Sequence, residues 1–198
     1  LVRDGCISRI FGVGAISSAF FFAFMVPNLF RRLFGDGALA SSFLPVYGKL
    51  AAKDPGEARK LASLLLGTMS LALGGMVLVG EIVLMALASR QESPVLLIRL
   101  LMITLPYMPL VCVVAMLGAM LQVRGRFGPT AAAPIIMNLC MILAMIAGPF
   151  LLPGTSFMDG TEHRITLVAA SIIVAGMIQI AWSLFALRAA GWARNDLG

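Results

Sequence analysis

Polar side chains interrupt an otherwise apolar stretch over residues 18–47, SAFFFAFMVPNLFRRLFGDGALASSFLPVY. They are Asn28, Arg31, Arg32 and Asp36. An arginine at the centre of a bilayer costs roughly 2.5–3.5 kcal/mol on insertion scales, so charges at that depth usually face a wet protein interior. Guanidinium groups bind phosphate and carboxylate oxygens through paired N–H donors. The stretch therefore predicts a cavity that binds an anion rather than a simple lipid-facing anchor.

A helix over 15–34 would carry most of these groups. At about 100° per residue, Asn28 lies near one face together with Arg31 or Arg32. Each arginine is either a cavity cation or an anchor at the cytoplasmic end; we favour the cavity for Arg31 and the anchor for Arg32. Pro27 should kink the helix and free a carbonyl, which needs a partner, so this turn should be buried against protein or water.

Three further polar residues stand in apolar surroundings. Arg3 and Arg9 lie within a short helix expected over 1–12. Their spacing corresponds to about 600° of rotation, so they point about 120° apart and at most one faces a central cavity squarely. Arg9 also suits an anchor at the membrane interface. For Asn138 we favour hydrogen bonding between helices over substrate contact.

Glu81 and Arg99 are opposite charges at the ends of two successive apolar stretches. The turn between these stretches, SRQESP, is short, which predicts antiparallel neighbouring helices. We therefore expect a structural ion pair near the outer interface rather than a role in transport.

Motifs of covalent catalysis are absent from the sequence. It contains no G-x-x-x-x-G-K-[ST] loop, no H-E-x-x-H and no nucleophile elbow. Cys6, Cys112 and Cys140 are widely spaced in apolar settings and favour neither a disulfide framework nor a metal site. His163 is the single histidine and has no partner at metal or nucleophile spacing. We expect no enzyme, no cofactor and no metal.

Composition places the chain in a membrane. Of its 198 residues, 60% are hydrophobic and 12% charged, and its mean hydropathy is +0.98. Soluble domains carry about 25% charged residues. The net charge of +6 is scattered through loops, without the basic stripe and interleaved aromatics of a nucleic-acid interface. We therefore expect no nucleic-acid partner.

The apolar stretches predict one all-α, polytopic membrane bundle over 1–198, with about six transmembrane helices. The first residues resemble the latter part of a helix, so we expect a chain truncated at both ends. Charged and polar loops are expected over 48–60 and 153–164, with Asp54 giving helix-start chemistry. Helices are expected over about 1–12, 15–34 with a continuation to 47 after a break at Gly35-Asp36-Gly37, 61–88, 95–122 (bent by Pro106 and Pro109), 130–152 and 165–187.

Basic residues predict the orientation of the bundle. Segments 48–60 and 124–129 and the C-terminal tail hold most of the loop lysines and arginines, whereas the opposite loops offer Arg90 and Arg164. By the positive-inside rule, the second, fourth and sixth helices should end in the cytoplasm.

Two blocks of the sequence resemble the MurJ (MviN) family of lipid II flippases. The first is AFFFAFMVPNLFRRLFGDGALASSFLPVY, which is similar to the family pattern D-A-F-x-x-A-F-x-x-P-N-x-x-R-R-[IL]-F-x-[ED]-G-A-x-x-x-x-F-[VI]-P. The second runs from Arg124-Gly125-Arg126-Phe127 through Pro134 to Asn138. About a dozen positions of mixed chemistry match in order, and the resemblance covers nearly the whole chain.

This resemblance implies a function. Such proteins flip lipid II, an undecaprenyl diphosphate that carries a muropeptide, across the bacterial cytoplasmic membrane by alternating access. Two lobes enclose a cationic cavity, and transport is coupled to the membrane potential or a monovalent cation. The chain would be the N-terminal lobe, with Arg3 and Arg31 binding the head group and Arg9, Arg32, Asn28, Asp36 and Asn138 as secondary candidates. The partners implied are lipid II, membrane lipids and the missing C-terminal lobe.

One departure from the family pattern stands at Ser18, where the family commonly has Asp, so acid-dependent gating at this position is in doubt. Two alternatives to the flippase stay open. One is a multidrug or polysaccharide-lipid exporter of the same superfamily, and the other is a non-transporting membrane scaffold.

Overall fold

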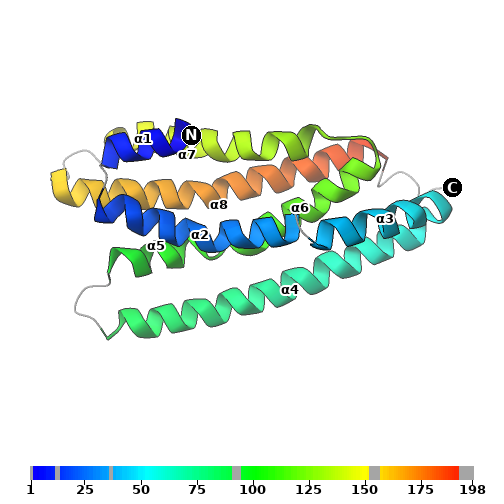
Figure 1. Cartoon of the computed structure of the whole chain (residues 1–198), viewed down its shortest axis with the longest axis horizontal. Helices are drawn as coiled ribbons and strands as arrows, with labels where there is room; N and C mark the ends of the chain where they lie inside the picture. Colours follow the sequence, from blue (N-terminus) through cyan, green and yellow to red (C-terminus); the bar gives the residue numbers. More distant parts are fainter. Residues whose placement is uncertain (1, 12–13, 36–37, 91–94, 152–156, 192–198) are drawn as a thin grey trace.

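The computed structural model describes residues 2–11, 14–35, 38–90, 95–151 and 157–191, and this part of the chain contains helices and no strand. The helices lie along the long axis of the molecule, with α7 and α4 on opposite sides (Figure 1). This confirms the predicted all-α bundle. The helices are α1 (Val2–Phe11), α2 (Ala15–Gly35), α3 (Ala38–Lys53), α4 (Pro55–Ala88), α5 (Leu96–Thr104), α6 (Tyr107–Val123), α7 (Gly128–Leu151) and α8 (Phe157–Ala189).

Helices α2 and α3 follow one another in the same direction along the bundle (Figure 1). The sequence predicted a helix over 15–34 with a continuation to 47, and α3 extends that continuation to Lys53. The predicted break includes Asp36, which lies outside the described residues.

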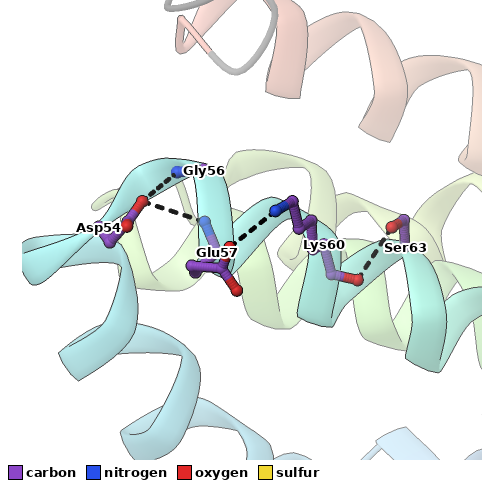
Figure 2. Close-up of polar contacts among 5 residues, drawn as sticks. All are labelled: Asp54, Gly56, Glu57, Lys60 and Ser63. Carbon is purple, nitrogen blue, oxygen red and sulfur yellow. Dashed lines mark hydrogen bonds and ion pairs between the residues drawn. The ribbon is translucent and has the colours of Figure 1, made fainter.

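Helix α4 begins directly after α3, and only Asp54 separates the two helices. Asp54 Oδ1 accepts hydrogen bonds from the backbone N–H groups of Gly56 at 2.9 Å and Glu57 at 3.1 Å (Figure 2). The predicted helix start is confirmed, but segment 48–60 is helical on both sides of Asp54 and is not the loop we predicted. Its alanine, lysine, arginine and glutamate residues are strong helix formers, and the aspartate supplies the cap.

We expect Asp54→Ala to lower the free energy of unfolding by about 1 kcal/mol, because the first N–H groups of α4 lose their acceptor. Thermal unfolding of the purified protein in detergent measures this loss. Lys60→Ala is the matched control: it removes an exposed pair with Glu57 at 2.8 Å (Figure 2), and because solvent screens such a pair, its loss should lower the stability less than the loss of the cap. Equal losses in the two variants would contradict the capping role.

Two helices, α5 and α6, stand where the sequence predicted a single bent helix over 95–122. Helix α5 ends at Thr104 and α6 begins at Tyr107. Pro106 has no N–H to continue the helical ladder, and the Met108 N–H instead reaches the Leu105 carbonyl at 3.0 Å. The proline-induced bend is thus a break in the helix.

Helix α8 begins at Phe157, well before the predicted residue 165, so most of the loop predicted over 153–164 is helical from that residue on. It packs against α7 along its length (Figure 1). Gly148 of α7 allows this approach, since a Cβ there would lie 3.2 Å from Arg164 Cγ. Polar residues 157–164 therefore form the first turns of α8.

Buried side chains form two clusters. The larger draws on every described helix except α3 and includes Phe20 and Tyr107. The smaller joins α3, α4, α6 and α8 and includes Tyr47 and Leu187. Helices α4, α6 and α8 contribute to both clusters, and α6 is the one that is buried along most of its length.

Four segments of the described chain are long and apolar enough to cross a membrane: Pro55–Ala88, Leu96–Val123, Gly128–Gly148 and Thr161–Ala189. The protein is therefore a multi-pass membrane protein. Six spans were expected. The difference lies in the N-terminal part, where α1 has 10 residues and α2 carries a proline and two arginines before the predicted break.

Candidate functional site

The candidate site is organised by a proline inside α2. Pro27 is buried and has no N–H to offer the Ala23 carbonyl one turn earlier. The Thr104 hydroxyl of α5 lies 3.2 Å from that carbonyl oxygen and donates to it. Thr104 is fully buried. The prediction that this turn is buried against protein is therefore confirmed.

One turn beyond the proline, Asn28 and Arg31 form a side-chain pair. Arg31 Nε donates to Asn28 Oδ1 at 3.2 Å, and both side chains are half-buried. The amide oxygen fixes the direction of the guanidinium plane without neutralising its charge. Two of the predicted site residues are thus brought together, and the guanidinium of Arg31 is of the kind that binds phosphate and carboxylate oxygens through paired N–H donors.

Tyr107 is the first residue of α6. It is 2% exposed, and its hydroxyl donates to Met137 Sδ of α7 at 3.7 Å. Helix α2, which carries the Asn28–Arg31 pair, packs against both α5 and α6.

Arg32 and Arg9 are exposed, in contrast to Arg31. Arg32 follows Arg31 directly, so the α-helical rotation of about 100° turns it away from the pair. No hydrogen bond among the described residues joins the half-buried Asn138 to Asn28 or Arg31. Arg3 belongs to α1, but its side chain, like Asp36, lies outside the described part of the structure.

Glu81 and Arg99 do not form the predicted ion pair. Glu81 Oε1 is buried and has no hydrogen-bond partner among the described residues. Helices α4 and α5 meet at Gly80 and Leu105, since a Cβ at Gly80 would lie 2.7 Å from Leu105 Cδ2. Arg99 lies six residues before Leu105, roughly 9 Å from that level along the helix axis at about 1.5 Å per residue.

A hollow of about 390 Å³ lies where the ends of four helices meet. Arg124 Nη1 donates to the Ala190 carbonyl at 3.0 Å and so ties the turn between α6 and α7 to the end of α8. The described residues of the three basic segments predicted to share one side of the membrane, up to Gly191 in the last of them, therefore lie at one end of the bundle (Figure 1). The hollow is lined by Gly48, Ala51, Ala52, Pro55, Val123, Arg124, Ala190 and Gly191.

Sequence reasoning missed Thr104 and its contact with α2. A signal was available, because Thr104 is the only serine or threonine between Val95 and Val123. A proline in one apolar helix frees a carbonyl, and a lone hydroxyl in another apolar helix is a natural donor for it. What the sequence does not contain is the register that brings the two together.

The sequence matches a known protein family and several curated proteins. The model of the family described as "Lipid II flippase MurJ" matches residues 7–196. Curated relatives named "Probable lipid II flippase MurJ" include those of Haemophilus influenzae (31% identical; 100% of this chain, 41% of the relative), Rickettsia prowazekii (28%; 96% and 37%) and Vibrio cholerae (30%; 100% and 40%). The chain thus spans about two fifths of the length of these relatives. It belongs to the MurJ lipid II flippase family.

Proposed function

We propose that this chain is the N-terminal lobe of a lipid II flippase of the bacterial cytoplasmic membrane. The complete protein would move undecaprenyl-diphosphate-linked muropeptide from the inner to the outer leaflet. Family membership over residues 7–196 supports this proposal, as do the names of the relatives and their greater length. The family is one of transporters, and the chain acts with a second lobe rather than as an enzyme.

The observation that carries the proposal is the Asn28–Arg31 pair inside an apolar bundle. A diphosphate presents oxygens that a guanidinium binds in a paired fashion. Arg31, with Arg3 from α1, would bind this group, while the polyprenyl tail stays among the membrane lipids. Arg9, Arg32, Asp36 and Asn138 remain secondary candidates.

The charge distribution supports a direction for transport. Lys49, Lys53 and Arg124 lie at the end of the bundle where α3, α6 and α8 end. Basic ends of this kind favour the cytoplasmic side. A cation moving with the membrane potential gains about 2.3 kcal/mol per 100 mV, so coupling to this potential or to a monovalent cation would supply the driving force.

Exposure of lipid II on the outer leaflet tests the function. Bacteria depleted of their own flippase receive the full reading frame that contains this chain, and an externally added toxin that degrades lipid II reports what has crossed. We expect cleavage to be restored to the level given by the native flippase. Membrane expression is checked on the same cells by immunoblot.

Absence of cleavage despite good membrane expression would reject the flippase. Export of dyes or lipid-linked polysaccharide by the same cells would then indicate the exporter alternative. Absence of any transport, together with retention of cell-wall proteins on the purified chain, would indicate a scaffold.

A further inference from the structure

Residues at the break between α5 and α6 contact four other helices. Thr104 reaches Ala23 of α2, and Leu105 packs against Gly80 of α4. Tyr107 packs against Gly176 of α8, where a Cβ would lie 3.0 Å from its ring, and bonds to Met137 of α7. The break is therefore a point at which α2 is linked, through these contacts, to α4, α7 and α8.

The hydroxyl of Thr104 lies within hydrogen-bonding distance of three carbonyl oxygens, at 2.9 Å from Leu100, 3.2 Å from Ala23 and 3.4 Å from Leu101. Leu100 and Leu101 lie within α5, where backbone N–H groups one turn later can satisfy their carbonyls. The Ala23 carbonyl has no helical N–H donor, because Pro27 stands where another residue would have donated its N–H. A carbonyl without a donor is unfavourable in an apolar medium, so the hydroxyl has its larger effect on the Ala23 carbonyl.

We propose that Thr104 is a positioning residue for the head-group site: its bond to the Ala23 carbonyl fixes the bend of α2 at Pro27 and so holds Asn28 and Arg31 in their observed direction. This inference rests on the proposed function of the site. Arg31 lies one turn beyond the bend, and its long side chain converts a small change of the bend into a displacement of the guanidinium. Misplacement by about 1 Å can cost 100-fold in a binding or reacting geometry.

The first test concerns the contact and needs no substrate. Thermal unfolding of the complete protein in detergent is measured for Thr104→Val, which removes the hydroxyl at nearly constant shape, and for Thr104→Ser, which keeps it. Both are repeated in combination with Pro27→Ala, which returns an N–H to the Ala23 carbonyl. We expect Thr104→Val to lower the unfolding midpoint when Pro27 is present but not when it is combined with Pro27→Ala. Thr104→Ser should leave the midpoint nearly unchanged in both backgrounds.

The second test concerns positioning. Lipid II exposure per folded protein should fall about three- to tenfold in Thr104→Val and return to within about twofold of wild type in Thr104→Ser. A midpoint that falls while transport per folded protein stays at the wild-type level would overturn the positioning role. So would a Thr104→Val effect that persists unchanged in the Pro27→Ala background, or equal losses in the Val and Ser variants.

These outcomes separate the inference from the function beneath it. If the wild-type protein fails to expose lipid II, the proposed function fails and the head-group role of Thr104 fails with it. The unfolding measurements still decide the Thr104–Ala23 contact in that case. If the wild-type protein transports lipid II, the Val and Ser variants decide the positioning role alone.

Discussion

Arg31→Ala is expected to lower lipid II transport by the complete protein by about 100-fold or more. Two charge-assisted hydrogen bonds to a diphosphate contribute about 1.5–3 kcal/mol each, and each 1.36 kcal/mol is a factor of about ten. Arg31→Lys should retain part of the activity, since the charge remains but the planar pair of donors is lost. Toxin cleavage of exposed lipid II, normalised to the amount of protein in the membrane, measures both.

Two exposed cations, Arg32 and Lys60, serve as controls for Arg31. Arg32→Ala removes an adjacent but exposed arginine and should cause a clearly smaller loss. Lys60→Ala removes an exposed cation that pairs with Glu57 at the start of α4 and should leave transport unchanged. Equal losses in Arg31→Ala and Arg32→Ala would show that local positive charge, rather than the Asn28–Arg31 geometry, carries the effect.

The bend in α2 shows how far sequence reasoning reaches. Pro27 predicts a kink and a carbonyl in need of a partner, because proline lacks the N–H that position requires. The identity of the partner depends on the packing of α2 against α5. Thr104 lies far along the chain from Ala23, and periodicity within one helix contains no information on the register between two helices.

The two corrected loops, 48–60 and 153–164, are both polar segments next to apolar ones. Polarity does not exclude a helix, and in 48–60 the alanine, lysine, arginine and glutamate residues are good helix formers. A bilayer core needs only about 20 residues per helix, whereas α4 has 34 and α8 has 33. A helix that extends beyond the hydrocarbon core of the bilayer carries polar residues in its outer turns. A change from apolar to polar residues therefore predicts where the helix leaves the membrane, not where the helix ends.

The Glu81–Arg99 prediction failed for a geometric reason. A short turn between two helices correctly predicts that α4 and α5 are neighbours. It does not predict the level at which they meet. The small size of Gly80 lets Leu105 pack against α4 at that point, and Arg99 stands about a turn and a half of helix before this level.

Gly176→Ala is expected to destabilise the bundle by about 1–3 kcal/mol, because overpacking a filled core forces side chains or backbone to shift. A Cβ at Gly176 would lie 3.0 Å from Tyr107 Cε2, 3.1 Å from its Cδ2 and 3.3 Å from Leu110 Cβ. The Tyr107 ring is 2% exposed and anchored by its hydroxyl bond to Met137, so it cannot move aside. Helices α6 and α8 would separate instead, and Gly176→Leu should prevent accumulation of folded protein.

Gly75→Ala on α4 is the matched control, since a Cβ there has no neighbour within 4 Å. Alanine is the better helix former by about 1 kcal/mol in water, so this variant should unfold at the wild-type temperature or above. Size-exclusion profiles and thermal unfolding in detergent compare the two substitutions in the complete protein. If Gly176→Ala matched Gly75→Ala, the α6–α8 contact would have room for a methyl group, and the close approach of Tyr107 to α8 would not limit the side chain at position 176.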